Sequence, residues 1–350
     1  MRRVQFPLPA PKFMSSYFST FTVGFEDLIE DILGNYLKNL NITLLADGLV
    51  VYETSSKIDD IKKLRFLNNS FVLLKEFENV DENSSTKILK SLIQDKTLTE
   101  TLNKHFAQKR LKFRIRTTYK NQFIAVNKDF MKNLEDKISL SSKNLKADRN
   151  LPDIELMINI RTEGFALAGM QFTKRPNYEK ILEKGQLAPE LAYIMCLLSD
   201  PNKNDVFLDP FAGYGSIPNQ RFLFPHKFII ANELDKKTRS KLKQNLHPNI
   251  KIEGQDALNL NMLKENSVDK IVTDPPWGVY EKILSVPRFY EQMLKEFNRI
   301  LKPNGTIVIL TAQKEIMDEL LAKQKNFDIN EEFSTLVSGK KAEVYKIIKR

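Results

Sequence analysis

The sequence of 350 residues has few of the residues that build metal centres or disulfide frameworks. Its single cysteine, Cys196, cannot form a disulfide within the chain, and a reducing cytoplasm suits it. Because Cys196 lies in an apolar stretch, we expect a buried position on a helix. The three histidines, His105, His226 and His247, lack the spacing of metal ligands, so we predict no metal site.

Long apolar segments are also missing. No run approaches the length of a membrane span, and the first residues lack the apolar core of a signal peptide. The composition, 42% hydrophobic and 28% charged, is that of a globular protein that can bury sizeable cores. The length predicts two or three domains. We therefore expect a cytoplasmic protein, a monomer, with no membrane partner.

The charge balance is strongly positive. The formal net charge is +10 and the sequence pI is about 9.3. Such a balance favours a polyanionic partner such as a nucleic acid, because phosphate neutralisation supplies much of the affinity for nucleic acids. Solvated surface lysines in a lysine-rich protein would give the same balance, and charge alone does not separate the two interpretations.

Hydrophobic periodicity organises the first half of the chain. Residues 19–77 show the order strand, helix, strand, strand, helix, strand, which is that of a ferredoxin-like unit. The acidic, polar residues 78–85 are typical of a solvated connection. Helices and strands follow up to residue 172. We predict one domain over residues 1–77 and a second over 78–172.

One strand of this half alternates between apolar and cationic side chains, and no acid interrupts its cationic face. The alternation favours a phosphate contact surface on a sheet. An ordinary exposed face that happens to be basic is the alternative. The candidate RNA-binding residues are Lys109, Arg110, Lys112, Arg114 and Arg116.

The order of three features in this half resembles that of the THUMP domain with its preceding ferredoxin-like segment, as found in RNA methyltransferases. They are Phe25–Leu28 after the first strand, the basic strand Lys109–Arg116, and Leu151–Leu156 ahead of the strand at 164–172. The resemblance implies a module that holds structured RNA, in tRNA enzymes by the CCA-bearing acceptor end.

The second half has a different pattern. Residues 173–186 have the character of a linker, and strands alternate with helices over residues 187–350. This alternation predicts an α/β domain with a mostly parallel sheet and a ligand edge at the carboxyl ends of the strands. The whole chain is thus expected to be an α+β module followed by a Rossmann-like α/β domain.

Acidic residues follow three successive strands of this half: Asp209, Glu233 and Asp256. After Asp209, Gly213 and Gly215 form a glycine-rich turn that permits close approach of a ligand to the backbone. A full G-x-G-x-x-G is absent, and an acid at the strand end would repel a pyrophosphate. The pattern suits a ligand with an ammonium group and a ribose. A loop acid or N-cap is the alternative at each single position.

The tetrapeptide Asp274-Pro275-Pro276-Trp277 follows the apolar strand 270–273. Two prolines stiffen the loop and keep Asp274 out of helical geometry. The Asp274 carboxylate and the Pro275 carbonyl could then accept both hydrogens of an exocyclic NH2 group while its ring stacks on Trp277. The alternative is that Pro-Pro merely ends a strand and the indole belongs to the core.

This half resembles class I S-adenosylmethionine-dependent methyltransferases, in particular the amino-methylating group with the motif [Asn/Asp]-Pro-Pro-[Tyr/Phe/Trp]. The resemblance implies a catalytic loop at Asp274–Trp277. It also implies S-adenosylmethionine as cofactor. The implied cofactor residues are Asp209, Phe211, Gly213 and Gly215 on the methionine side, Glu233 at the ribose, and Asp256 with Ala257 at the adenine. Trp277 and Ser216 depart from the usual Tyr or Phe and the usual Thr of THUMP-linked guanine enzymes.

The resemblance implies methyl transfer to the exocyclic N2 of guanosine in structured RNA, with tRNA favoured over rRNA. An N6-adenine methyltransferase of RNA or DNA stays open because Trp277 is similar to the residue in adenine methylases. An RNA-binding protein with a degenerate methylase domain is the alternative that is not an enzyme. The sequence does not distinguish mono- from dimethylation or give the modified position.

Overall fold

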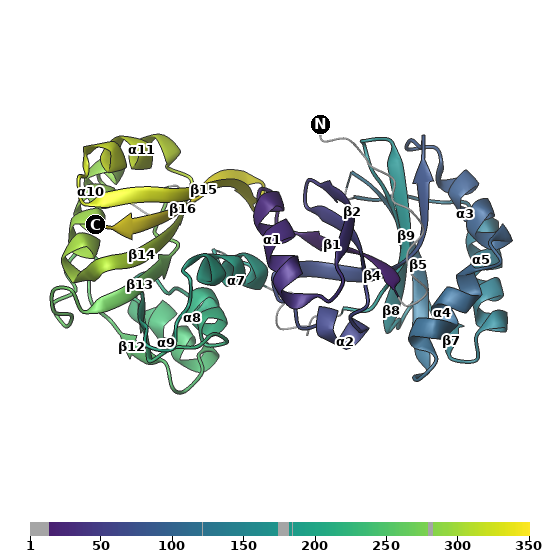
Figure 1. Cartoon of the computed structure of the whole chain (residues 1–350), viewed down its shortest axis with the longest axis horizontal. Coiled ribbons are helices and arrows are strands. Elements are labelled where there is room, and N and C mark those ends of the chain that lie inside the picture. Colours follow the sequence, from purple (N-terminus) through teal and green to yellow (C-terminus); the bar gives the residue numbers. More distant parts are fainter. Residues whose placement is uncertain (1–13, 121, 174–181, 184, 279–282) are drawn as a thin grey trace. The chain divides into compact units, whose positions relative to one another are not determined.

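The computed structural model describes residues 14–120, 122–173, 182–183, 185–278 and 283–350 (Figure 1). Contacts between residues divide the chain into two compact units. Unit 1 takes in the chain up to Arg175 except Thr22–Phe25, and unit 2 takes in Thr22–Phe25 and the chain from Pro176. The expected two or three domains thus correspond to two units by contact.

Unit 1 is built around one sheet flanked by short helices. Its strands are β1 (Ser15–Phe21), β2 (Asn41–Ala46), β3 (Leu49–Thr54), β4 (Leu67–Glu78), β5 (Leu111–Tyr119), β6 (Gln122–Phe123), β7 (Leu145–Ala147), β8 (Ile154–Ile160) and β9 (Phe165–Gln171). Its helices are α1 (Glu26–Tyr36), α2 (Ile58–Ile61), α3 (Ser85–Gln94), α4 (Leu98–Phe106) and α5 (Lys128–Ser141).

The first four strands adopt the antiparallel order β2-β3-β1-β4, which fits the predicted ferredoxin-like unit. The sheet then continues without a break as β9-β8-β5-β6, because β4 pairs along its length with β9. The predicted boundary between residues 77 and 78 falls at the end of β4, inside this sheet. The division of unit 1 into two domains stays a prediction.

A small apolar cluster joins β1, β4 and β9 across that predicted boundary. The rings of Phe18 and Phe71 stack with their centroids 4.4 Å apart, and Leu167 of β9 packs against them. Gly169 makes this possible, since a Cβ at Gly169 would stand 2.4 Å from Cε1 of Phe18. The two halves of unit 1 therefore share a core as well as a sheet.

Unit 2 alternates strands and helices, as the sequence predicts. Its strands are β10 (Val206–Asp209), β11 (Phe228–Asn232), β12 (Lys251–Glu253), β13 (Val268–Thr273), β14 (Leu301–Thr311), β15 (Phe327–Val337) and β16 (Lys340–Lys349). Its helices are α7 (Pro189–Leu198), α8 (Ser216–Arg221), α9 (Lys236–Asn245), α10 (Val286–Ile300) and α11 (Lys314–Lys323). Cys196 is buried in α7, as expected.

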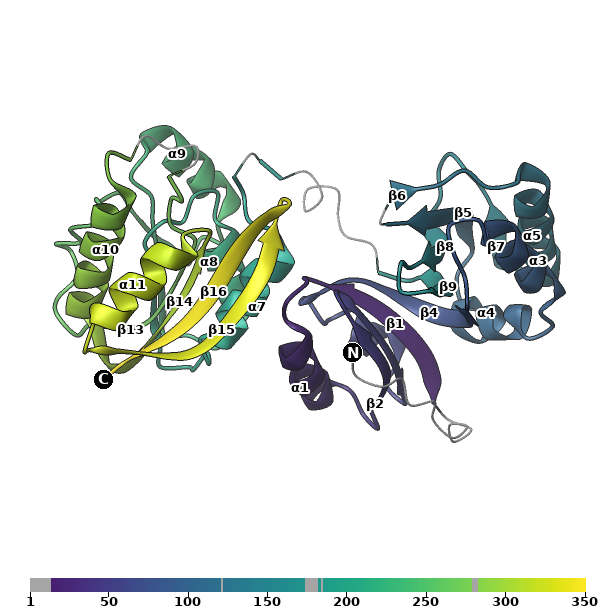
Figure 2. The same ribbon diagram turned by 90° about the horizontal axis from the view of Figure 1, so that it is seen from above.

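The sheet of unit 2 has the order β12-β11-β10-β13-β14-β16-β15, and Figure 2 labels β13, β14, β16 and β15 of this sheet. The first five strands are parallel, and β15 and β16 form an antiparallel hairpin at one edge. The predicted α/β fold class with a mostly parallel sheet is confirmed. The chain runs from β10 outward through β11 and β12 and then returns to β13 on the other side of β10. Ligands bind at such a reversal point in open α/β sheets.

Helix α10 covers one face of this sheet with an apolar stripe. Tyr290, Met293, Leu294, Phe297 and Ile300 recur at helical spacing and are all fully buried. Burial of this stripe fixes the position of α10 on the sheet, and with it the position of Tyr290 near the end of β13.

Candidate active site

The Asp-Pro-Pro-Trp loop leaves β13 and lines a cavity of about 1160 Å³ whose walls all come from unit 2. Pro275 is buried, whereas Asp274, Pro276 and Trp277 are half-buried and exposed to the cavity. The indole Nε1–H of Trp277 donates to Oδ1 of Asp274 over 2.9 Å. The indole is therefore part of the cavity wall, and the interpretation that it belongs to a closed core does not hold.

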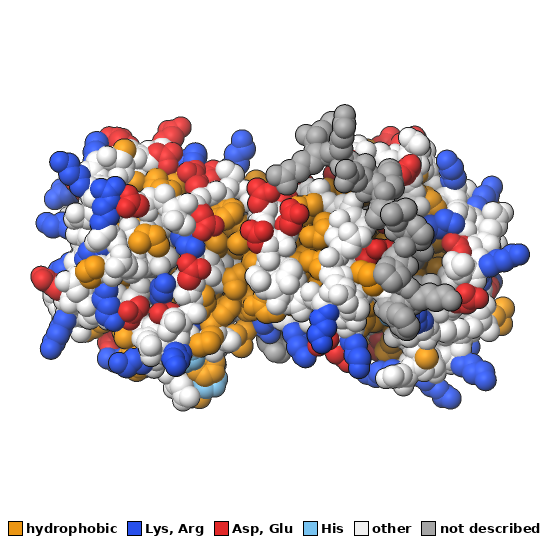
Figure 3. All heavy atoms as spheres, in the orientation of Figure 1, with side chains coloured by type: hydrophobic (Ala, Val, Ile, Leu, Met, Phe, Trp, Pro, Cys, Tyr) orange, Lys and Arg blue, Asp and Glu red, His pale blue; other side chains and the backbone are white. Residues whose placement is uncertain are grey.

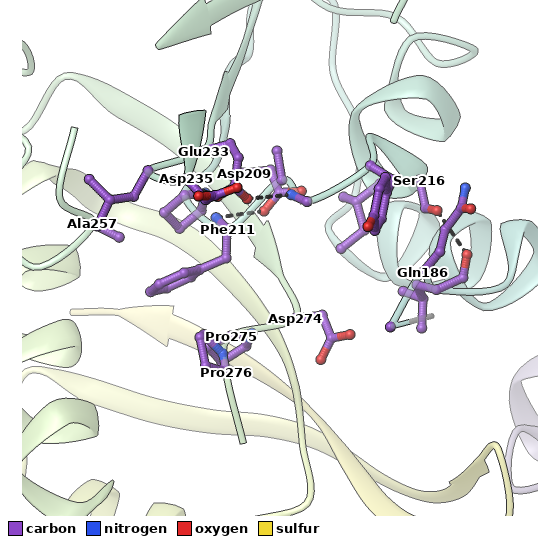
Figure 4. Close-up of a pocket in the computed structure, with 18 of the residues that line it drawn as sticks. Gln186, Asp209, Phe211, Ser216, Glu233, Asp235, Ala257, Asp274, Pro275 and Pro276 are labelled. Carbon is purple, nitrogen blue, oxygen red and sulfur yellow. Dashed lines mark hydrogen bonds between the residues drawn. The ribbon is translucent and has the colours of Figure 1, made fainter. Parts of the chain in front are cut away.

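The carboxylate of Asp209 lies across the cavity from the prolines of this loop (Figure 4). Its Oδ1 accepts hydrogen bonds from the Thr273 hydroxyl over 2.9 Å and from the Phe211 backbone N–H over 3.2 Å. Its Oδ2 is buried and has no hydrogen-bond partner among the described residues. Burial raises the pKa of Asp209 from 3.8 to about 8. A buried acid with an unused oxygen at a cavity wall is poised to receive a cationic group.

The two glycines of the turn serve different purposes. A Cβ at Gly213 would meet nothing within 4 Å, and Gly213 lines the cavity, so its missing side chain leaves room there. Gly215 has φ +92°, and a Cβ would stand 2.7 Å from Cδ2 of Leu246. It is needed for the left-handed backbone and for packing of the turn against the residues around α9.

Glu233 follows β11 and is held beside the glycine turn. Its Oε2 accepts from the Gly213 N–H over 3.0 Å and its Oε1 from the Asp235 N–H over 2.8 Å. The guanidinium of Arg239 donates to the Glu233 backbone carbonyl over 2.7 Å and so fixes the strand end. The carboxylate is thereby held at the cavity wall.

Asp256 and Ala257 follow β12 and line the same cavity. Asp256 is exposed, and its Oδ1 accepts from the Leu258 N–H over 3.0 Å, whereas Ala257 is buried. The cavity thus brings together the candidate catalytic and cofactor residues that the sequence pattern indicates, except Gly215, which is not part of its lining. The roles of these residues remain predictions.

The cavity wall is markedly acidic. Carboxylates outnumber ammonium groups among the side chains that line it, and the acids are Glu183, Asp209, Glu233, Asp235, Asp256 and Asp274 against Lys236 and Lys340. Such a wall favours cationic ligands and disfavours polyphosphates. The expectation that a pyrophosphate is not the ligand agrees with this charge balance.

Sequence reasoning missed several lining residues. Gln186 and Leu187 precede α7, Phe289 lies on α10, and Val337 and Ser338 come from the hairpin turn. The Ser216 hydroxyl donates to the Leu187 carbonyl over 2.8 Å and ties the segment before α7 to the glycine turn. The sequence does not indicate that the turn between β15 and β16 lies beside the cavity, because that position depends on the pairing of β16 with β14.

The basic strand β5 is less free than its sequence indicates. Arg114 and Arg116 both pair with Glu155 of the neighbouring β8, Arg116 over 3.6 Å, and Lys112 pairs with Asp148 over 2.9 Å. The acids that are absent from the strand itself come from other segments of unit 1. Basic and acidic side chains are also interspersed on the face of the molecule in Figure 3. The phosphate-binding role of these cations stays a prediction.

The described residues contain no group of three or more His, Cys, Asp and Glu side chains that could hold a metal ion. None of their helices combines the length and the apolar character needed to cross a membrane.

Comparison with known proteins identifies unit 2. A family model described as an RMKL-like methyltransferase domain matches residues 176–220 and 230–342. The matched segments make up most of unit 2, which therefore resembles this methyltransferase domain. The match includes the Asp209 strand end, the glycine turn and the Asp-Pro-Pro-Trp loop of the domain.

Two curated relatives come from Methanocaldococcus jannaschii. A tRNA (guanine(10)-N2)-dimethyltransferase is 29% identical over 50% of this chain and 54% of its own length. A tRNA (guanine(6)-N2)-methyltransferase is 25% identical over 61% of this chain and 66% of its own length. The chain therefore spans between about half and two thirds of these relatives.

Solved structures share the fold over nearly the whole chain. TrmN from Thermus thermophilus superposes with a TM-score of 0.75 at 20% identity, covering 96% of this chain and 100% of that one. SMU.472, solved in complex with SAH, gives a TM-score of 0.71 at 15% identity, covering 97% of this chain and 99% of that one. At these identities the likeness establishes the fold. The folds of the two units therefore occur together in other proteins.

Proposed function

We propose that this protein transfers a methyl group from S-adenosylmethionine to the exocyclic N2 of a guanosine in tRNA. One observation carries the proposal: the rigid Asp-Pro-Pro-Trp loop and the acids at the ends of β10 and β11 line one cavity. The printed functions of the two archaeal relatives, both tRNA guanine-N2 methyltransferases, support the choice of base and of RNA.

The residues of the cavity fit S-adenosylmethionine. Asp209 presents a buried oxygen without a hydrogen-bond partner, which suits the ammonium group of the methionine moiety. Glu233 presents a fixed carboxylate, which can accept from both ribose hydroxyls. The open space at Gly213 leaves room for the ligand beside the backbone. When bound, the cofactor supplies an electrophilic methyl group on a sulfonium.

The loop supplies acceptors for a nucleobase amine. The Asp274 carboxylate and the Pro275 carbonyl would accept the two N–H groups and aim the nitrogen lone pair at the methyl carbon. The amine would thereby be held for attack on the methyl group that the bound cofactor would supply, and Asp274 or water would take the amine proton. Positioning of this kind can supply much of the rate.

The face of Trp277 would stack on the target base. A base in a duplex must leave its helix to reach such a loop, which favours an unpaired or extruded guanosine. The cations of β5 in unit 1 would hold the RNA backbone, together with the exposed Lys109 and Arg110 that precede the strand.

The test is methylation of unmodified tRNA and rRNA transcripts by the purified protein with cofactor labelled on its methyl group, followed by mass spectrometry of nucleosides. N2-methylguanosine in tRNA supports the proposal. Label in N6-methyladenosine would show that the target base is adenine. Label in rRNA alone would show that tRNA is not the substrate. Absence of cofactor binding in calorimetry would favour an RNA-binding protein without catalysis.

A further inference from the structure

Two carbonyl groups of the Asp-Pro-Pro-Trp loop are held by side chains that follow the loop in the chain. The hydroxyl of Tyr290, a fully buried residue of α10, donates to the Pro276 carbonyl over 3.3 Å. The side-chain amide of Gln313, the residue before α11, donates from Nε2 to the Trp277 carbonyl over 2.5 Å. Neither side chain is part of the motif.

The direction of the hydrogen bonds behind the loop is fixed. Tyr290 has one hydroxyl proton, and the Pro276 carbonyl can only accept it. The Thr311 hydroxyl, 2.7 Å from that of Tyr290, must therefore donate to Tyr290. The Thr311 oxygen in turn accepts from the Gln313 backbone N–H over 3.0 Å. Hydrogen bonds that all run in one direction and are shielded from water resist rearrangement.

The same arrangement reaches the carboxylate that is proposed to hold the amine. The indole Nε1–H of Trp277 ends on Oδ1 of Asp274 at 2.9 Å. The position of the indole therefore contributes to the orientation of the Asp274 carboxylate, and the bond from Gln313 contributes to the position of the Trp277 backbone. A Phe at this position would keep the ring but lose the N–H.

We propose that Tyr290 and Gln313 are positioning residues for methyl transfer, and that the indole N–H of Trp277 orients Asp274 for that reaction. This inference rests on the proposed function. Tyr290 and Gln313 act through the loop, because they bond to its backbone from outside the motif. A displacement of about 1 Å in a reacting group can lower the rate about 100-fold. Loss of either bond should thus act on kcat.

The test compares Tyr290→Phe and Gln313→Glu with a matched control. Both substitutions keep the side-chain size and remove the donor to the loop. Tyr345→Phe is the control, because Tyr345 is also fully buried in unit 2 and its hydroxyl donates to Asp318 over 2.7 Å. We expect kcat to fall about 10- to 100-fold in the two loop variants, with KM for RNA and cofactor affinity within about threefold. Trp277→Phe should lose kcat in the same range.

A second readout does not require catalysis. Trp277 is the single tryptophan of the chain, so intrinsic fluorescence reports on the loop alone. We expect a red-shifted emission and stronger acrylamide quenching in Tyr290→Phe and Gln313→Glu, and a wild-type spectrum in Tyr345→Phe.

Unchanged kcat or unchanged fluorescence in both loop variants would overturn the inference, and so would an equal loss of kcat in the control. If the wild-type protein methylates no RNA, the proposed function fails, whereas the fluorescence comparison still decides whether these bonds hold the loop.

Discussion

The substitution Asp209→Asn tests the most unusual electrostatic feature of the cavity. Burial raises the pKa of Asp209 from 3.8 to about 8, so the folded protein keeps a proton that the unfolded chain loses near pH 4. An acid with a raised folded pKa makes stability fall as pH rises between those two values. Each pH unit in this range costs about 1.4 kcal/mol. Between pH 5 and pH 7 the contribution of Asp209 to stability should therefore fall by about 3 kcal/mol.

Asparagine at position 209 cannot titrate, so the variant should lack this slope. The assay is urea unfolding of both proteins at pH 5, 6 and 7 without cofactor, followed by the fluorescence of Trp277. That signal reports on unit 2, which contains both residues. Because the two proteins are compared by the slope of their unfolding free energy against pH, any effect of the new amide that does not depend on pH cancels. Asp328→Asn serves as the control, because its exposed carboxylate pairs with Arg350, which lowers the pKa of Asp328.

The same variant should bind S-adenosylmethionine at least about 10-fold more weakly, because a charge-assisted hydrogen bond to the ammonium is lost. In the wild type, affinity should rise between pH 6 and pH 7, since Asp209 must release its proton before it can pair with a cation. Parallel stability profiles for wild type and Asp209→Asn, with equal cofactor affinity, would contradict both the raised pKa of Asp209 and its proposed contact with the ammonium group.

Asp274→Ala should lower kcat about 1000-fold with cofactor affinity nearly unchanged, whereas Asp274→Asn keeps an acceptor and should retain more activity, as single-turnover assays would reveal. Gly215→Ala should destabilise unit 2 by about 2 kcal/mol in urea unfolding, because the backbone is left-handed and Leu246 blocks the Cβ; an unchanged midpoint would contradict this. Arg110→Ala should weaken RNA binding and its salt dependence more than Arg114→Ala, because Arg114 already pairs with Glu155; equal losses in a titration at several salt concentrations would contradict it.

The acids of the site could be predicted because their positions follow from strand order alone. Once strands and helices alternate, the carboxyl ends of the strands meet at one edge, and the acids that follow them meet there too. Asp209, Glu233 and Asp274 accordingly line one cavity. The glycine turn was also visible, but the sequence could not show that Gly215 faces Leu246 rather than a ligand.

Other features depend on contacts between distant segments. In the sequence, Tyr290 is only one member of an apolar helical stripe. Its hydrogen bond to the Pro276 carbonyl depends on how α10 packs on the sheet. The pairing of Arg114 with Glu155 requires the parallel register of β5 and β8, in which these two residues are direct partners. Three-residue β7 was missed because it is too short to show alternation.

We propose that a rigid acceptor pair presents the amino group of a guanosine in tRNA to an activated methyl group. Nucleoside mass spectrometry of tRNA from a strain without this protein tests it most directly. We expect the N2-methylguanosine content of that tRNA to fall, and to return with the wild-type protein but not with Asp274→Ala. An unchanged N2-methylguanosine content, or full restoration by Asp274→Ala, would contradict it.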